Sequence, residues 1–462
     1  MYFGIDFGTT HTTAVAFDGQ NLTFIPLDHA NSDPHLLRSM LYINRQHESI
    51  LGVEAVQSYL KDNTGRLAKL EQKKVGTIEN TVSRVTRMPL EPDGPIVIVY
   101  DVIIEEDVGA LGRLLQSIKT GLRDPEYPGT TIFDRFFSIE DLITILLTHV
   151  KKSIKKKTGK DVKSATFGRP VQFSEDAEAD ALAEARLRKA AEIAGFESID
   201  FLPEPVAAAL FYTKDLTESK TILVFDFGGG TLDLTIMKSN PNEPLSTQIL
   251  GVQGVLVGGD DLDSAIMREK VSPYFGVNDK IDRQGHPFPA HLAAKLNRWQ
   301  TIPELSKVES IPIIRKARVN GTNPDGFLAL ECLALKNYGF SVFEIIEQAK
   351  RRLSSETETQ LAMQVEDIDF DLTYARREFQ THILDELANT QQGIKNVLEK
   401  SGVAAEEIDV VVTTGGSSLI PIFRSILQRR FTNAELVHSN TFGSVAAGLA
   451  IHNFNQAETA VS

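Results

Sequence analysis

The sequence contains almost no cysteine and no long apolar run. Cys332 is the single cysteine among 462 residues, so no intrachain disulfide can form, and such sparing use of thiols fits a reducing compartment. No apolar run approaches roughly 18 residues, the length that marks a membrane-spanning helix. The first residues, Met1 to Asp6, enter a strand pattern at once, without a basic region or a cleavage site. We therefore expect a cytoplasmic protein that is neither exported nor inserted in a membrane.

The sequence also lacks an excess of basic residues. It has 48 Lys and Arg against 62 Asp and Glu, which gives a formal net charge of −14. An acidic surface repels phosphate backbones and anionic lipids, because affinity for nucleic acid depends on Lys and Arg displacing counterions. We expect no nucleic-acid partner and no membrane partner, and a phosphate site must be built from something other than bulk charge. The 42% of apolar residues is ordinary globular composition and excludes disorder as the dominant state.

Several common signatures of enzyme sites are missing as well. The glycine turns described below have neither Walker A nor Rossmann spacing. No serine or cysteine triad is indicated, since Cys332 stands alone in an apolar stretch, and the ten histidines include no zinc-protease helix motif. His286 and His291 fit a loop surface better than a metal site.

The most informative feature that is present is an internal repeat. Residues 4–10 (GIDFGTT) recur as residues 224–231 (VFDFGGGT), and in each copy a buried strand ends in Asp, followed by glycine and Thr. A β-favouring stretch follows each copy, which predicts strand, tight glycine turn, strand. Two hairpins of one design predict two related lobes, lobe I over residues 1–219 and lobe II over residues 220–462.

Helices and strands alternate through the rest of the chain. Apolar residues at helical spacing predict helices after the N-cap Ser138 and over residues 176–194, 343–355 and 376–400. Residues 276–330 are rich in Pro, Gly and Asn and predict an insertion or a loosely structured subdomain. Each lobe is expected to be an α/β core with a smaller inserted subdomain, over about residues 36–110 in lobe I and 265–375 in lobe II.

The repeated glycine turns can hold phosphate even in an acidic protein. Without a side chain, backbone N–H groups approach an anion closely, and positive φ values are accessible. Asp6 and Asp226 end the repeated strands and would face one place from opposite lobes. Their mutual repulsion calls for a cation between them, and Mg²⁺ prefers oxygen ligands while it keeps several waters. Thr9 and Thr231 place hydroxyls near a terminal phosphate, and Asp233, on the same strand face as Thr231, can orient a water.

Five spaced motifs resemble the ATPase domain shared by actin, the sugar kinases and the heat-shock protein 70 chaperones. They are two phosphate motifs at residues 4–10 and 224–233, two connecting motifs at 201–210 and 442–448, and an adenosine motif at 415–421. The chaperone branch is favoured by Gly-Gly-Gly-Thr-x-Asp, by Glu-Pro-Val-Ala-Ala-Ala, and by residues 347–355 (EQAKRRLSS), which are similar to its nucleoside-binding helix. The resemblance implies a two-lobed actin-like ATPase fold of the α/β class, with a ribonuclease H-like core in each lobe, a mixed five-stranded sheet with helices.

The resemblance also implies a role for each matching residue. It makes Asp6 and Asp226 partners of Mg²⁺ through water. It makes Glu204 and Asp233 organisers of the metal shell and the attacking water, and it brings Lys119 to the γ-phosphate. The predicted catalytic residues are Asp6, Lys119, Glu204, Asp226, Thr231 and Asp233.

The predicted nucleotide-binding residues come from the glycine turns and from the helix expected at 343–355. Four of them recur at positions i, i+3, i+4 and i+7 and so share one helix face, which independently permits a common ligand. The set is Gly8, Thr9, Thr10, Gly228, Gly229, Gly230, Thr231, Gly258, Gly259, Glu347, Lys350, Arg351, Ser354, Gly415, Gly416 and Ser417. Leu419 and Phe442 depart from the family pattern, which has arginine and aspartate there, so the affinity and the choice of base do not follow from the resemblance.

The implied function is Mg²⁺-dependent binding and slow hydrolysis of ATP to ADP by a stand-alone chaperone-type ATPase domain that acts as a nucleotide-driven switch on a protein partner. The chain ends soon after the last motif, so we expect no substrate-binding domain, as in the short YegD-like relatives to which it is similar. Three alternatives stay open: a nucleotide-binding scaffold without significant turnover, a sugar-kinase-like phosphotransferase, and an actin-like filament.

Overall fold

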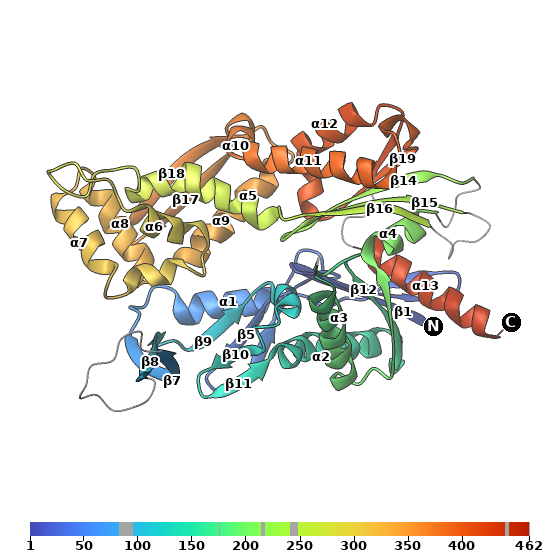
Figure 1. Cartoon of the computed structure of the whole chain (residues 1–462), viewed down its shortest axis with the longest axis horizontal. Coiled ribbons are helices and arrows are strands. Elements are labelled where there is room, and N and C mark those ends of the chain that lie inside the picture. The colour runs from blue at the N-terminus through green and yellow to red at the C-terminus, as the bar shows by residue number, and fades with distance from the viewer. Residues whose placement is uncertain (83–95, 175, 214–217, 241–247, 439–442, 462) are drawn as a thin grey trace, which may run out of the picture.

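The computed structural model describes residues 1–82, 96–174, 176–213, 218–240, 248–438 and 443–461. The chain folds into two lobes, one formed mainly by the N-terminal part of the chain and the other mainly by the C-terminal part (Figure 1). None of the helices in these ranges combines the length and the apolar character that crossing a bilayer requires.

The sheet of lobe I contains β1 (Tyr2–Phe7), β2 (His11–Phe17), β3 (Leu22–Phe24), β4 (Leu37–Arg38), β12 (Ser164–Arg169) and β13 (Ser198–Pro203). Its strand order is β13-β12-β1-β2-β3, and β4 pairs with β2 beside this path. β1 runs antiparallel to β2 and parallel to β12, which is parallel to β13. Ile5 on β1 and Phe167 on β12 are fully buried.

The sheet of lobe II contains β14 (Thr221–Phe227), β15 (Leu232–Lys238), β16 (Gln248–Val255), β19 (Val410–Thr414) and β20 (Glu435–His438). Its order, β16-β15-β14-β19-β20, and its strand directions repeat those of lobe I. The central strand β14 is apolar on both faces because helices cover both sides of the sheet. The predicted duplication of a mixed five-stranded sheet is confirmed, and with it the two-lobed actin-like fold.

Two helices, α4 (Glu204–Thr213) and α13 (Ser444–Val461), cross each other where the lobes join. α13 lies near the C-terminal end of the chain but packs on β1, β2 and β12 of lobe I (Figure 1). The crossing is so close that a Cβ at Gly448 would lie 1.8 Å from the backbone oxygen of Ala207. The glycine and alanine residues of the two connecting motifs therefore allow backbone contact at the junction of the lobes.

Two helices of lobe I begin at side-chain caps, and the sequence predicts the first of these caps, Ser138. In α2 (Ile139–Thr158), Ser138 Oγ accepts a hydrogen bond from Asp141 N at 3.0 Å, and Asp141 Oδ2 accepts one from Ser138 N at 2.9 Å. In α3 (Ala177–Ile193), the Asp176 side chain accepts hydrogen bonds from the backbone of Glu178 and Ala179. These bonds satisfy N–H groups that have no partner within the helix. Both predicted helices are confirmed, to within one residue at each end of α3.

The helices of lobe II outside the sheet are α5 (Gly259–Ile266), α6 (Ala290–Ala293), α7 (Ile311–Asn320), α8 (Pro324–Leu335), α9 (Gly339–Arg352), α10 (Arg376–His382), α11 (Leu384–Ser401) and α12 (Pro421–Arg430). The hairpin of β17 (Glu358–Val365) and β18 (Ile368–Ala375) lies among them. The expectation of loose structure over residues 276–330 is wrong, since Leu305, Ile314 and Phe327 are fully buried in the core of lobe II. Periodicity is weak there because several short helices each contribute few apolar residues.

Two predicted helices also differ in their boundaries. The helix expected over residues 343–355 runs from Gly339 to Arg352, so it begins four residues and ends three residues earlier than predicted, and Ser354 lies beyond its end. The single helix expected over residues 376–400 is broken between α10 and α11, where Ile383 leaves the helical conformation and becomes fully buried. Burial of this side chain against the rest of the lobe outweighs the continuous helical pattern.

The outer part of lobe I faces lobe II across the mouth of the cleft. It contains β5 (Leu41–Asn44), β6 (Ser49–Leu51), α1 (Gly52–Asn63), β7 (Leu70–Val82), β8 (Ile96–Asp107), β9 (Gly112–Leu115), β10 (Gly129–Ile132) and β11 (Arg135–Ser138). The Tyr59 ring on α1 packs at 5.6 Å from that of Phe340 and at 5.9 Å from that of Trp299, both in lobe II. Asn337 Nδ2 of lobe II donates to Tyr59 Oη at 2.8 Å.

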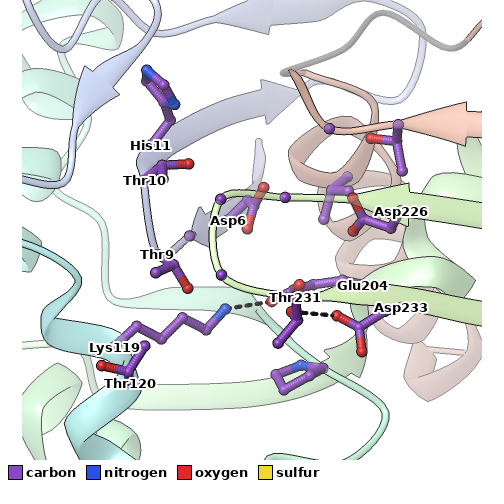
Figure 2. Close-up of a pocket in the computed structure, with 18 of the residues that line it drawn as sticks. Asp6, Thr9, Thr10, His11, Lys119, Thr120, Glu204, Asp226, Thr231 and Asp233 are labelled. Carbon is purple, nitrogen blue, oxygen red and sulfur yellow. Dashed lines mark hydrogen bonds and ion pairs between the residues drawn. The ribbon is translucent and has the colours of Figure 1, made fainter. Parts of the chain in front are cut away.

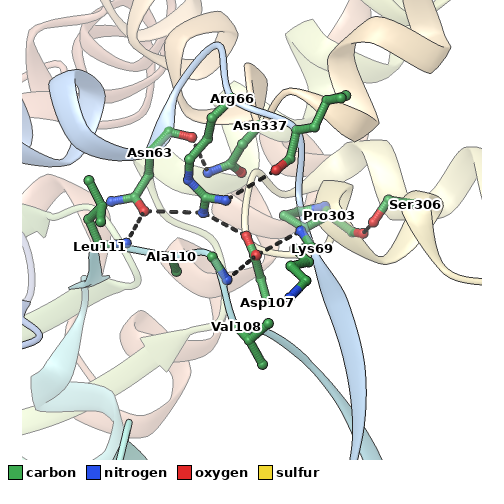
Figure 3. Close-up of polar contacts among 12 residues, drawn as sticks. Asn63, Arg66, Lys69, Asp107, Val108, Ala110, Leu111, Pro303, Ser306 and Asn337 are labelled. Atoms are coloured by element: carbon green, nitrogen blue, oxygen red, sulfur yellow. Dashed lines mark hydrogen bonds and ion pairs between the residues drawn. The ribbon is translucent and has the colours of Figure 1, made fainter.

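A polar cluster fixes the root of the β7–β8 hairpin at the same mouth (Figure 3). Arg66 Nη2 contacts Asp107 Oδ2 at 2.6 Å and donates to Asn63 Oδ1 at 3.2 Å. Two backbone hydrogen bonds then join residues 65–68 to the carbonyls of residues 335–336 in lobe II. The mouth is therefore closed by aromatic packing and by backbone pairing between the lobes.

Candidate functional site

A pocket lies between the lobes at the turns of the two repeated hairpins (Figure 2). Gly8 N donates to the His11 oxygen, and Gly228 N donates to the Thr231 oxygen, both at 3.0 Å. The two turns are thus closed by the same backbone bond and lie on opposite walls of one pocket. The lining residues are Asp6, Gly8, Thr9, Thr10, His11, Thr13, Lys119, Thr120, Arg123, Pro170, Gln172, Phe173, Glu204, Asp226, Gly228, Gly229, Gly230, Thr231, Asp233, Thr414, Gly415, Gly416 and Val445.

The two turns approach each other closely enough to require glycine. A Cβ at Gly229 would lie 2.1 Å from Cγ2 of Thr10 in the other lobe. The turn formed by Gly228 to Gly230 therefore presents bare backbone beside the threonine hydroxyls of the first turn. Closely packed backbone N–H groups in such a turn form a cradle for an anion.

Three aspartates of the strands that flank the turns point into this pocket. Asp6 and Asp226 hold equivalent places, each being the penultimate residue of its strand, and Asp233 is the cross-strand partner of Asp226. Burial, and then the charge of Glu204, raise the pKa of Asp6 to about 7. Burial and the neighbouring carboxylates raise the pKa of Asp226 well above its ordinary value. The pKa of Asp233 is raised to about 6, mainly by burial, although Thr231 Oγ1 donates to its carboxylate at 2.9 Å.

Lys119 brings a positive charge to these carboxylates. It lies on the short helix η1 (Ile118–Arg123), and its Nζ contacts Glu204 Oε1 at 2.6 Å (Figure 2). Only 9% of Lys119 is exposed. Burial disfavours its charged form, but Glu204 and Asp6 outweigh that effect and raise the Lys119 pKa. The structure thus places the predicted lysine and the first residue of α4 together, 85 positions apart in the sequence.

Several predicted nucleotide-binding residues lie behind the second turn. Gly259 N donates to the Gly228 oxygen at 3.0 Å, and Ser417 Oγ donates to the same oxygen at 3.2 Å. Lys350 Nζ on α9 donates to the Gly259 oxygen at 2.8 Å and pairs with Asp263 at 2.8 Å. Gly258 precedes Gly259 at the N-terminus of α5. These contacts support the turn from outside the pocket wall.

The other residues of the predicted nucleoside-binding face lie near the pocket without lining it. Glu347 is held by Arg38 of lobe I, whose Nη2 donates to Glu347 Oε2 at 3.2 Å. Burial disfavours the charged form of Glu347, but Arg38 and the lysine and arginine one turn along α9 lower its pKa. Arg351 is exposed and Ser354 is half-buried. Gly415 and Gly416, in contrast, do line the pocket.

Sequence reasoning missed three charged or titratable groups at the nucleoside end. Arg38 and Glu344 belong to no recognised motif, and Arg38 lies on a strand of only two residues. His11 directly follows the first phosphate motif and lines the pocket. Burial lowers the His11 pKa to about 4, so the imidazole is neutral at pH 7. Its position next to the motif is the one signal by which His11 could have been selected.

Of the two departures from the family pattern, the structure describes one, Leu419. Leu419 lies at the end of the short helix η8 (Gly416–Leu419) and is 44% exposed. An exposed leucine can offer apolar contact to a base but no charge. Phe442 lies outside the described residues.

The chemistry of the carboxylates can be compared with what Mg²⁺ requires. Asp6, Glu204, Asp226 and Asp233 line one pocket, where burial and the neighbouring carboxylates raise the pKa values of Asp6, Asp226 and Asp233 and so disfavour their charged forms. A hydrated Mg²⁺ ion, which accepts carboxylate oxygens and retains waters, would relieve the repulsion between these carboxylates. Over the residues that the structure describes, no three His, Cys, Asp or Glu side chains are grouped so as to enclose a metal directly.

Comparison with known protein families gives a match to both lobes. The model of the family described as Hsp70 protein matches residues 117–296 and 341–454. These segments make up more than half of the chain. They include Lys119, α4, the second glycine turn and the turn at Gly415, whereas the first glycine turn and β4 lie before the first matched segment.

Proposed function

The chain belongs to the Hsp70 family, and we propose that its pocket binds ATP and ADP with Mg²⁺ and hydrolyses ATP slowly. A nucleotide-binding ATPase domain of the chaperone type follows from the family. The observation that carries the catalytic part of the proposal is the position of Lys119, which is paired with Glu204 at the place where two equivalent glycine turns meet.

The two turns are proposed to hold the phosphates. Backbone N–H groups of both turns, that of Thr231 included, and the hydroxyls of Thr9 and Thr10 are the donors available to phosphate oxygens, since the Thr231 hydroxyl donates to Asp233. Lys119 adds a positive charge at the γ-phosphate. Mg²⁺, held through water by Asp6 and Asp226, would supply the positive charge that an anion needs in a pocket of carboxylates.

Asp233 and Glu204 are proposed to position the attacking water. Thr231 Oγ1 occupies one acceptor site of the Asp233 carboxylate, which leaves its other lone pairs to accept a hydrogen bond from water. Glu204 fixes the direction of Lys119 through their 2.6 Å contact. Positioning and electrostatics supply most of the rate in phosphoryl transfer, so these fixed groups suit the reaction.

Helix α9 is proposed to form the nucleoside end of the site. Glu347 and Arg351 on α9, and Ser354 just beyond its end, are the candidates to contact ribose and base, with the turn at Gly415 and Gly416 beneath them. Lys350 is held between Gly259 and Asp263. Its contribution is to support the second phosphate turn from the same helix.

The proposal extends to the organisation and role of the chain. Lobe I over residues 1–219 and lobe II over residues 220–462 would close on ATP and relax on ADP, which makes the chain a nucleotide-driven switch for a protein partner. A reducing, cytoplasmic location is proposed on the basis of the single cysteine, Cys332, which is buried in lobe II.

The test is to measure nucleotide binding by calorimetry and phosphate release on the same preparations. The wild-type protein is expected to bind ADP more tightly with Mg²⁺ than with a chelator, and to release phosphate from ATP. Asp226→Asn is expected to lose the effect of Mg²⁺ and to lower phosphate release at least about tenfold. Asp161→Asn, which removes an exposed carboxylate near Lys155, is the matched control and should behave as the wild type.

The outcomes separate the proposal from its alternatives. Binding of ADP without any phosphate release would leave a nucleotide-gated scaffold. ATP consumption that appears only when a sugar is added, with a phosphorylated product, would identify a kinase. Absence of both binding and turnover would refute the proposed function.

A further inference from the structure

Residues 37–39 of lobe I lie directly against the first glycine turn. Ser39 N donates to the Thr10 oxygen at 2.8 Å, and Ser39 Oγ donates to the Gly8 oxygen at 2.8 Å. The Ser39 hydroxyl also lies 3.0 Å from that of Thr12, and both residues are buried. These three contacts fix the short strand β4 to the back of the turn.

The middle residue of this segment, Arg38, crosses the cleft to helix α9. Its Nη1 donates to Glu344 Oε2 at 3.1 Å, and its Nη2 donates to Glu344 Oε1 at 2.8 Å and to Glu347 Oε2 at 3.2 Å. The Arg38 side chain is only 18% exposed. Two parallel bonds from the planar guanidinium to one carboxylate set direction as well as distance, which a lysine cannot do.

One turn further along, the same helix is linked to the second glycine turn through Gly259. Lys350 donates to the Gly259 oxygen, and Gly259 N donates to the Gly228 oxygen. Helix α9 is thus connected to the first turn through Arg38 and residues 37–39, and to the second turn through Lys350 and Gly259. Hydrogen bonds thus link α9, at the nucleoside end of the pocket, to both glycine turns.

We propose that Arg38 is a positioning residue that holds Glu347 and fixes α9 relative to the first phosphate turn, so that nucleoside and phosphates are bound in one register. The proposal rests on the proposed function, since it assumes that a nucleotide occupies the pocket. It assigns a role to Arg38 and Glu344, which no motif indicated. Because Arg38 does not line the pocket and its guanidinium contacts Glu344 and Glu347 rather than the pocket carboxylates, its loss should weaken nucleotide binding without slowing the chemical step.

The first experiment needs no nucleotide. Hydrogen exchange of ligand-free Arg38→Met is compared with that of the wild type and of Arg315→Met, a control that removes an arginine paired with Glu331 inside lobe II. Faster exchange in residues 344–351 for Arg38→Met alone is the expected result. Unchanged exchange there would refute the role of Arg38 in fixing α9, whether or not the protein binds nucleotide.

The second experiment separates positioning from general stability. For Arg38→Met we expect the KM for ATP to rise about tenfold and kcat to stay within about twofold, which corresponds to loss of about 1.4 kcal/mol in binding. A fluorescent ADP analogue should dissociate faster, whereas the affinity for pyrophosphate, which has no nucleoside, should change less. Arg38→Lys should restore only part of the affinity, and Glu344→Gln should add little to Arg38→Met in the double variant.

Two results would overturn the inference. A loss of kcat with unchanged KM would place Arg38 at the reacting phosphates. An equal loss of affinity for ADP and for pyrophosphate would show that α9 and the first turn are not held in register by Arg38. Failure of the wild-type protein to bind ADP would instead refute the proposed function. The exchange experiment would still decide whether Arg38 fixes α9.

Discussion

Replacement of Asp6 by asparagine should make the ligand-free protein more stable while it removes Mg²⁺-dependent binding. Asp6 lies in a pocket where burial and the Glu204 charge disfavour its ionised form, and its pKa is raised to about 7. Above that pH the folded protein must hold a charged carboxylate in a place that favours the neutral one. Asparagine has nearly the same shape and never ionises, so this cost disappears.

The size of the effect follows from the pKa. A rise from the ordinary value of 3.8 to about 7 corresponds to about 4 kcal/mol against the charged form. Because neighbouring groups relax, we expect Asp6→Asn to raise the free energy of unfolding at pH 8 by about 2–4 kcal/mol. For a chain of 462 residues that is a rise of about 2–4 °C in the melting temperature.

The dependence on pH identifies the cause. Between the unfolded and folded pKa values of Asp6 the unfolded chain is ionised and the folded protein is protonated, so wild-type stability falls as the pH rises from about 4 to 7. The advantage of Asp6→Asn should therefore be largest at pH 8 and shrink steadily toward pH 5. Asp18→Asn should instead lower the free energy of unfolding at pH 8, and this loss should shrink toward acidic pH. The reason is that the backbone N–H groups of Asn21 and Gln20 lower the pKa of that exposed carboxyl.

The assay is unfolding of ligand-free protein at pH 5, 6, 7 and 8, repeated at pH 8 with Mg²⁺ and ADP. With ligand, the wild type should gain more stability than Asp6→Asn, because the proposed Mg²⁺ site requires the Asp6 carboxylate. An advantage of Asp6→Asn that is the same at pH 5 and pH 8, or a loss of stability at pH 8, would refute the reasoning about Asp6.

Two further predictions concern the glycine turn and the mouth of the cleft. Gly229→Ala places a Cβ 2.1 Å from Thr10 Cγ2, so it should push the turns apart and lower the affinity for ADP at least about tenfold, as measured by calorimetry. Gly285→Ala is the control: its φ of +84° strains the backbone locally, but its Cβ meets no atom within 4 Å, so it should leave binding unchanged. Phe340→Ala removes a ring that is 2% exposed and packs on Tyr59 and Trp299, so it should lower the free energy of unfolding by about 3–5 kcal/mol in denaturant titrations. A change below about 1 kcal/mol would show that the mouth is not held by this packing.

The sequence alone determined the features that depend on short stretches of chain. The two glycine turns are visible because a buried strand, an aspartate, glycines and a threonine occur together twice, and the duplicated sheets follow from that repeat. The start of α2 is visible because Ser138 and Asp141 cap it within four residues. Such local signals do not depend on what the rest of the molecule supplies.

Local patterns failed where distant packing decided the structure. The segment over residues 276–330 carries little periodicity, yet its apolar side chains are buried against helices and strands far away in the sequence. The break at Ile383 arises in the same way, because a buried contact outweighs a continuous helical pattern. Propensity differs by less than a kilocalorie per mole for most residues, about the gain from burying one methylene group, so tertiary contacts can override it.

The functional site also combines features set by local sequence with features set by tertiary contacts. The sequence by itself determined the turns, the aspartates beside them and the helix that carries Glu347 and Lys350. Only the tertiary structure decided that Lys119 meets Glu204, that Lys350 points to the back of the second turn, and that Arg38 reaches α9 from a position 306 residues before Glu344. The physical reason is that an ion pair needs two side chains at one point in space, and a sequence contains no distance between residues that only folding brings together.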